Sequence, residues 1–161
     1  MSEARFTATV LWQRGAGEVF TDNRYSRGHL WSFDGGVAVP ASSAPSSVPL
    51  PLSRADAVDP EEALVAAVSS CHMLFFLSFA AREKLVVERY EDAATGLMAR
   101  RDDGHVAMTE ITLHPAIVFS GVRRPDAALL AALHHEAHEA CYIARSVTAR
   151  VTVAGPAPVF A

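Results

Sequence analysis

The amino-acid sequence predicts a domain of the α+β class. Half of its 161 residues are hydrophobic, so the chain has the length of one domain and can bury a substantial core. Segments with strand-like and helix-like patterns follow one another as strands, helix, strands, helix, strand, without the regular alternation of an α/β protein. We therefore expect one α+β domain over residues 1–161.

The N-terminal part is predicted to form strands joined by turns. Residues 5–12 (RFTATVLW) are rich in β-formers and partly alternating, and a glycine-containing break followed by residues 18–26 (EVFTDNRYS) indicates a hairpin. A third strand is expected at residues 29–33 (HLWSF), ended by a turn at residues 34–36 (DGG). Residues 40–57 are rich in proline and serine, and such a long irregular connection is typical of a segment that covers a site or a partner.

The first predicted helix has a clear start and an uncharged body. Asp59 is placed to cap free amides, Pro60 suits the first helical position, and Glu62 stands at the capping-box position. We expect this helix to run to about Lys84. Residues 63–81 carry no charge, which predicts a helix that is buried on every side.

The C-terminal part is predicted to form strands around a second helix. Residues 85–98 and 105–120 have the pattern of two long strands joined by a polar turn. Pro125 and Asp126 open an amphipathic helix with one polar face, and residues 146–155 (SVTARVTVAG) alternate as a closing strand.

Composition and charge narrow the classes of function. The net charge of −4 is mild and the basic residues are scattered, so we expect no nucleic-acid partner. The longest apolar stretch, residues 73–81, is short for a membrane span, and the N-terminus lacks the apolar run of a secretion signal, so we expect a cytoplasmic protein without a membrane partner. Two cysteines in a reducing compartment favour transient redox chemistry over a structural disulfide.

The histidines form no familiar metal motif. His134 and His138 stand four residues apart on one helical face, but the spacing of His135 and His138 is one residue short of the zincin motif. We therefore interpret this face as solvated and expect no bound metal. The remaining candidates lie in separate segments and are interpreted as structural: His29, His72, His105 and His114.

The two cysteines are the strongest candidates for chemistry. Cys71 lies midway along the first helix and Cys141 near the end of the second. A buried cysteine is most often a small hydrophobic residue. Packing of one helix on the other would nevertheless bring the two thiols together, and the spacing in the sequence leaves both readings open.

Two cysteine-containing segments resemble the OsmC/Ohr family of thiol-dependent hydroperoxide reductases, in its OsmC-like subgroup. They are DPEEALVAAVSSCHM and HHEAHEACYIARSVTARVTV, and YSRGHLWSFDGG and the order of elements agree with them. The resemblance implies antiparallel sheets packed around a long central helix in an intertwined homodimer. It further implies that Cys71 is the peroxidatic thiol, Cys141 the resolving thiol, and Arg27 and Glu61 the other active-site residues.

The resemblance also implies a reaction and its partners. Cys71 would attack a hydroperoxide, most suitably an organic one, and Cys141 would then close a disulfide that an external dithiol, such as a lipoyl protein, reduces without any bound cofactor. Glu61 and Cys71 stand about 15 Å apart along one helix, so either the long Arg27 side chain spans much of the gap or Arg27 and Glu61 come from the partner subunit. Of these two options we expect the second, with composite sites at the dimer interface. Two alternatives stay open: a non-enzymatic domain that binds a small ligand, with structural or regulatory cysteines, and a metal-dependent enzyme that uses the histidine face.

Overall fold

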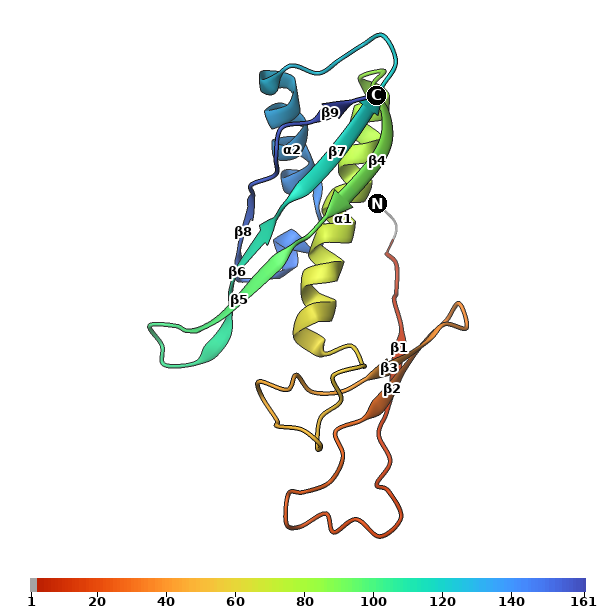
Figure 1. Ribbon diagram of the computed structural model, residues 1–161, viewed down its shortest axis with the longest axis vertical. Helices are drawn as coiled ribbons and strands as arrows, with labels where there is room; N and C mark the ends of the chain where they lie inside the picture. The colour runs from red at the N-terminus through yellow and green to blue at the C-terminus, as the bar shows by residue number, and fades with distance from the viewer. Residues whose placement is uncertain (1–2) are drawn as a thin grey trace. The chain divides into compact units, whose positions relative to one another are not determined.

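The computed structural model describes residues 3–161 and divides the chain into two compact units, one ending at Ala63 and one spanning Leu64–Ala161. The α+β class is confirmed (Figure 1). In chain order the elements are β1 (Ala8–Leu11), β2 (His29–Phe33), β3 (Ala38–Ala41), α1 (Pro60–Arg82), β4 (Val86–Asp92), β5 (Thr95–Arg100), β6 (Val106–Leu113), β7 (Pro115–Ser120), α2 (Ala127–Ala140), the 3₁₀ turn Ala144–Ser146, β8 (Arg150–Val153) and β9 (Val159–Phe160).

The first unit is built on an antiparallel sheet in the order β1-β2-β3. In its register Trp31 pairs with Val10 on one side and with Val39 on the other. The predicted turn after β2 is confirmed, with Gly36 at φ 82°. These strands place the residues of β1 and β3 at the two open edges of the sheet.

The predicted strand over residues 18–26 is wrong, because residues 12–28 form an irregular loop. Its aromatic residues pack on one another instead of joining a sheet: the Phe20 and Tyr25 rings stack at 4.6 Å, and the Trp12 and Tyr25 rings meet edge-on at 5.2 Å. Side chains also form hydrogen bonds to backbone groups that would otherwise pair with a neighbouring strand. The Trp12 indole donates to the Ser26 carbonyl oxygen at 2.8 Å, and the Glu18 carboxylate accepts from the Ser26 N–H at 3.0 Å.

The helix start agrees with the prediction, and so does the irregular connection except for its first two residues, Pro40 and Ala41, which belong to β3. No regular strand or helix occupies residues 42–59. At its end Asp59 and Glu62 form a reciprocal capping box: the Glu62 N–H donates to Asp59 Oδ1 at 2.8 Å, and the Asp59 N–H donates to Glu62 Oε2 at 3.3 Å. The start of α1 is therefore set by its own first turn.

Helix α1 buries only one face within the chain. Val68, His72, Phe76 and Ala80 recur every four residues and are at most 1% exposed. The prediction of burial on every side is wrong for a single chain, because Leu74 on another face is 61% exposed. Figure 1 shows α1 beside α2 in the second unit.

The two predicted long strands are each divided in two. Strand β4 pairs with β7, and β5 pairs with β6, so the hairpin changes direction between Asp92 and Thr95. The Asp92 carboxylate occupies this bend: it accepts the Ser69 hydroxyl at 2.5 Å and the His114 N–H at 2.6 Å. Opposite Asp92, Pro115 is the first residue of β7 and has no backbone N–H to donate to a neighbouring strand.

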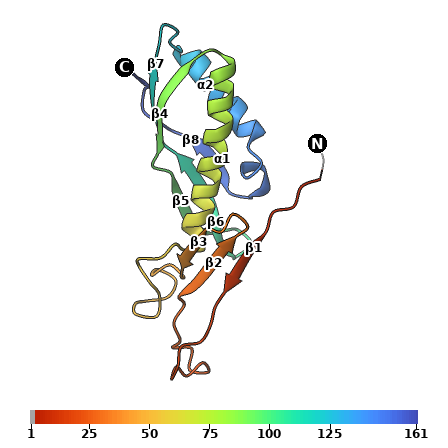
Figure 2. The same cartoon turned by 90° about the vertical axis from the view of Figure 1, so that its right-hand side faces the viewer.

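The C-terminal strands complete two mixed three-stranded sheets. Strand β8, the predicted closing strand, pairs in parallel with β6, and the short β9 pairs in parallel with β7. Helix α2 starts at Asp126, whose Oδ1 accepts the Leu129 N–H at 2.7 Å. Figure 2 shows both helices on the same side of β4 and β7, where Phe76, Phe119 and Leu133 form the centre of the core.

Candidate active site around two cysteines

The structure brings the two cysteines together within the second unit. Cys71 lies midway along α1, and Cys141 is the C-cap of α2. The Cys141 thiol lies 4.0 Å from the carbonyl oxygen of Val68, one helical turn before Cys71. One turn after Cys71, the Phe75 ring meets the Tyr142 ring edge-on at 5.2 Å. The end of α2 is thus packed against the turns of α1 that carry Cys71.

The two thiols are free and differ in environment. Cys141 is fully buried, whereas Cys71 is partly exposed. Burial, together with a hydrogen bond between the two thiols, raises the pKa of Cys141 to about 11, although the Ala144 N–H donates to its sulfur at 3.3 Å. Cys141 is therefore a protonated thiol at neutral pH, and Cys71 is the sulfur that a solute can reach.

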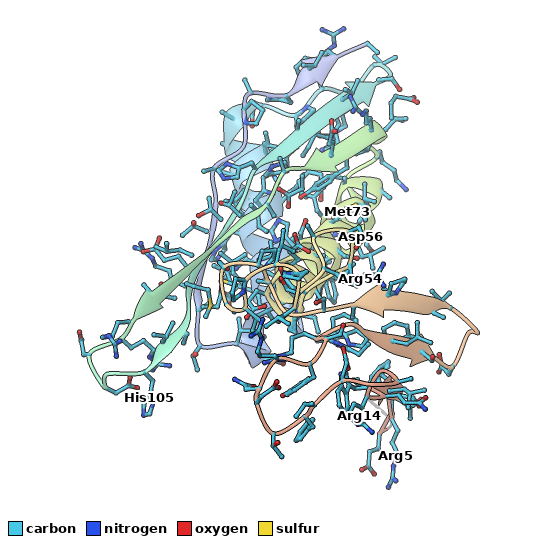
Figure 3. The ribbon with its side chains drawn as sticks, turned by 60° about the horizontal axis from the view of Figure 1, so that its bottom comes forward. Arg5, Arg14, Arg54, Asp56, Met73 and His105 are labelled. Carbon is cyan, nitrogen blue, oxygen red and sulfur yellow. The ribbon has the colours of Figure 1, made fainter. Side chains whose placement is uncertain are left out.

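Arg27 lies in the loop of the first unit and has no carboxylate partner among residues 3–161. Its guanidinium donates to the backbone oxygens of Tyr25 and Asn23 and to Asn23 Oδ1, and it stands 3.8 Å from the centre of the Tyr25 ring. Arg54 differs, because both its Nε and its Nη2 bind the Asp56 carboxylate. Both residues are labelled in Figure 3. Of these two cations in the first unit, Arg27 is the one whose charge is not neutralised.

Glu61 lies in the first turn of α1. Its Oε2 is buried and has no hydrogen-bond partner among the described residues. A buried carboxylate oxygen without a donor is costly, so this position calls for a donor that the described contacts do not supply. Arg27 and Glu61 belong to the first unit and are not paired with each other.

The solvated histidine face that the sequence predicts on α2 is found only in part: His135 is exposed, whereas His134 and His138 are partly buried. His134 Nδ1 lies 3.1 Å from Nε2 of His72, and the two rings stack at 5.4 Å. Burial, together with the neighbouring charges of His134 and His138, lowers the pKa of His72 to about 4. Burial also lowers the pKa of His134 to about 4, although Asp92 acts in the opposite direction. The pair is therefore neutral at pH 7. Sequence reasoning missed it, although a histidine in an uncharged helix signals that a polar partner is needed.

The other histidines hold separate places. His29 Nδ1 lies 2.8 Å from the Arg27 carbonyl oxygen, and His114 Nε2 lies 3.5 Å from the Thr95 hydroxyl. His105 is exposed at the tip of the β5–β6 hairpin, where Figure 3 labels it. Within residues 3–161, no group of three or more histidine, cysteine, aspartate or glutamate side chains is arranged to hold a metal ion.

Comparison with solved structures finds the same fold in OsmC-like proteins and in organic hydroperoxide resistance proteins. An OsmC-like protein of unknown function from Vibrio cholerae is 47% identical, with a TM-score of 0.94 over 96% of this chain and all of the other. Two organic hydroperoxide resistance proteins share the fold at low identity. That of Elizabethkingia anophelis is 17% identical (TM-score 0.65, 96% and 99% of the two chains), and OhrB of Bacillus subtilis is 18% identical (TM-score 0.59, 97% and 98%).

The sequence itself also matches a family. A comparison with curated proteins finds no match. The sequence model of the family described as OsmC-like protein matches residues 53–154. The matched segment includes both cysteines and both helices, and residues 155–161 lie outside it. This match covers more than half of the chain and agrees with the 47% identity to the protein from Vibrio cholerae. The chain belongs to the OsmC-like protein family.

Proposed function

We propose that the protein is a thiol-dependent peroxidase that reduces organic hydroperoxides. The observation that carries this proposal is the pair of free, neighbouring thiols of unequal exposure, Cys71 and Cys141. The hydroperoxide resistance proteins that share the fold support the reaction class. The scheme needs no bound cofactor, because the two thiols supply the two electrons that reduce the hydroperoxide as they form a disulfide.

In the first step the Cys71 thiolate attacks the distal oxygen of the hydroperoxide ROOH. The S–O bond forms as the O–O bond breaks, giving a sulfenic acid at Cys71 and the alcohol ROH after proton uptake. Cys141 is unsuited to this step, because its thiol is fully buried and its raised pKa keeps it protonated. The apolar side chains one and two turns along α1, Phe75 and Phe79, suit an organic substituent.

In the second step the Cys141 sulfur attacks the sulfenic sulfur of Cys71. A disulfide forms and water leaves, which protects Cys71 from further oxidation. The thiols already interact, so closure needs only local movement at the C-cap of α2. An external dithiol, such as a lipoyl group in a cytoplasmic protein, then reduces the disulfide by exchange and is itself oxidised.

Arg27 and Glu61 complete the proposed site. An unneutralised guanidinium next to Cys71 would favour the thiolate and bind the peroxide oxygens. The orphaned Oε2 of Glu61 is an acceptor that could orient this guanidinium. We propose that both residues reach Cys71 in a homodimer, with Arg27 and Glu61 supplied by the partner subunit.

The exposed face of α1 supports the homodimer. By length and composition α1 is long enough and apolar enough to cross a membrane, so its apolar part is longer than residues 73–81; the core helix of a globular protein passes the same test, and the absence of a membrane partner stays a prediction. A lipid surface is a poor partner, however, because α1 carries on its core face the buried His72 and is packed against strands with charged residues such as Arg89 and Glu91. A second copy of the chain would cover Leu74 and its uncharged neighbours without this conflict.

Single-cysteine variants test the proposal. We expect Cys71→Ser to abolish turnover of cumene hydroperoxide with a dithiol reductant. Given one equivalent of peroxide, Cys141→Ser should form a sulfenic acid that dimedone traps at Cys71, and each further equivalent should over-oxidise that sulfur. Full turnover by Cys71→Ser would contradict the proposal, and so would a dimedone adduct at Cys141 in the wild-type protein.

A further inference from the structure

A cavity of about 590 Å³ lies within the second unit, between α2 and the strands β7 and β8. Leu130 and Ala131 line it from the helix, Ile117 and Val151 line it from the strands, and residues 154–158 close its rim. Its volume falls in the range of small-molecule sites, roughly 300–1,000 Å³. Neither cysteine lines it, so a ligand here would occupy a site separate from the thiol pair.

The wall of this cavity has a distinctive chemistry. Its ionisable side chains are three imidazoles on one face of α2, those of His134, His135 and His138. No aspartate, glutamate, lysine or arginine lines it, and the remaining side chains are aliphatic or proline. The cavity therefore offers an apolar enclosure with hydrogen-bonding groups along one side. Such a wall matches a ligand with a hydrocarbon body and a single polar head.

The buried histidine pair decides which kind of head fits. Nδ1 of His72 is buried without a partner among the described residues. A bare acceptor nitrogen is less costly there than an unpaired N–H, so the proton of His72 belongs on Nε2, which donates to Nδ1 of His134 at 3.1 Å. His134, neutral in its buried place, then carries its own proton on Nε2. Nε2, the ring nitrogen of His134 that does not face His72, is then a donor, and His134 lines the cavity.

We propose that this cavity binds a small apolar carboxylic acid, with the carboxylate on the imidazole wall and the hydrocarbon against Ile117, Leu130 and Val151. A carboxylate accepts several N–H bonds at once, and charge-assisted bonds are stronger than those of a neutral head. No acidic side chain in the lining opposes an anion. This site goes beyond the proposed peroxidase, because it uses neither thiol.

Calorimetric titration with decanoate and with decanol tests the head group. We expect saturable binding of decanoate, at about one molecule per chain, and at least tenfold weaker binding of decanol, which has the same chain length without the charge. Equal affinities would remove the role given to the imidazoles. The absence of saturable decanoate binding would overturn the proposal.

A matched pair of variants tests the location. Ala131 lines the cavity, whereas its neighbour Ala132 is exposed and does not. Ala131→Trp should weaken decanoate binding at least tenfold, and Ala132→Trp should leave it unchanged. Equal effects of the two substitutions would place the ligand elsewhere, for instance on the exposed face of α1.

Two further measurements locate the decanoate site without relying on a cavity variant that could misfold, and show whether binding needs the thiols. In methyl-labelled wild-type protein, nuclear Overhauser contacts should join decanoate to Ile117, Leu130 and Val151; contacts to other methyl groups alone would contradict the assignment. Cys71→Ser should bind decanoate like the wild type even though it has lost peroxidase turnover. Loss of binding in this variant would show that the cavity is not a separate site.

Discussion

Cys141 is fully buried at the C-cap of α2, while Cys71, its hydrogen-bonding neighbour on α1, keeps part of its surface exposed. The same contact therefore joins a thiol that solutes can reach and one that they cannot. This asymmetry assigns the proposed roles without reference to the order of the residues in the chain. It also makes the two thiols separable by experiment.

Alkylation should reveal the raised pKa of Cys141. In Cys71→Ser, we expect the rate of Cys141 alkylation by iodoacetamide to be very low at pH 8 and to rise as the pH approaches 11, because burial disfavours the thiolate. The matched variant Cys141→Ser provides the exposed thiol for comparison. A midpoint below pH 9 for Cys141 would show that its thiol is not desolvated.

Arg27 should control the rate of peroxide attack. We expect Arg27→Ala to slow peroxide consumption by about tenfold to a hundredfold, since a charge-assisted hydrogen bond contributes roughly 1.5–3 kcal/mol. Arg27→Lys should restore only part of the rate, because lysine lacks the planar fork. Arg54→Ala is the control, since Arg54 already pairs with Asp56. Equal losses in the Arg27 and Arg54 alanine variants would remove the special role of Arg27.

Subunit exchange tests where Arg27 acts. Mixing the inactive Cys71→Ser protein with the slowed Arg27→Ala protein should raise the activity well above that of either parent, because one of the two composite sites in each heterodimer is then intact. Activity that stays at the level of the Arg27→Ala parent after exchange has been demonstrated would place both residues in one chain.

The His72–His134 pair should make the protein sensitive to acid. Both pKa values fall to about 4 in the folded chain, whereas a histidine in the unfolded chain titrates near 6.5, so the unfolded state binds more protons between these values. The stabilisation is complete above about pH 6.5 and is lost as the pH falls toward 4. For His72 the loss is on the order of 3 kcal/mol.

Urea unfolding at pH 7 and pH 4.5 measures this loss. The decrease in unfolding free energy between the two pH values should be smaller by about 2 kcal/mol in His72→Phe than in the wild type. His105→Phe, at an exposed hairpin tip, should behave like the wild type. An unchanged pH dependence in His72→Phe would mean that the pair is not the source of the acid sensitivity.

The exposed side of α1 should be the dimer contact. Leu74 is 61% exposed, and an added charge there would be buried in the proposed interface. We expect Leu74→Glu to weaken the dimer at least a hundredfold in sedimentation experiments. Val122→Glu, at a fully exposed position, should leave the dimer intact. A wild-type monomer, or a Leu74→Glu protein that stays dimeric, would contradict this assignment.

Local signals in the sequence were sufficient for both helices and much of the sheet structure. Asp59, Glu62 and Asp126 act through hydrogen bonds to amides within three residues, and these can be recognised from spacing alone. The closing strand β8 was likewise predicted by alternation over a few residues. Such features depend on near neighbours in the chain.

The errors arose where distant residues decide the structure. Residues 18–26 have the composition of a strand, but Trp12 and Tyr25 pack on each other and hold them in a loop. Asp92 bends the hairpin through bonds to Ser69 and His114, which lie 23 and 22 residues away. For the same reason the sequence predicts a surface position for His134: its partner, His72, is 62 residues away on the other helix.

The candidate site also has features that the sequence predicts and features that depend on distant residues. That the two helices bring Cys71 and Cys141 together was an open possibility from the sequence, and the difference in their exposure was not predictable, because it depends on how the C-cap of α2 packs on α1. The roles of Arg27 and Glu61 rest on the family resemblance and stay predictions.

Disulfide mapping after one equivalent of cumene hydroperoxide is added to the reduced protein tests the proposed reaction of Cys71 and Cys141 most directly. We expect the rapid loss of two free thiols per chain and, by mass spectrometry of non-reduced peptides, a bond between the peptides that contain Cys71 and Cys141 within one chain. Both thiols remaining free after the peroxide has been supplied, or a Cys71–Cys71 bond between chains in place of the Cys71–Cys141 bond, would contradict it.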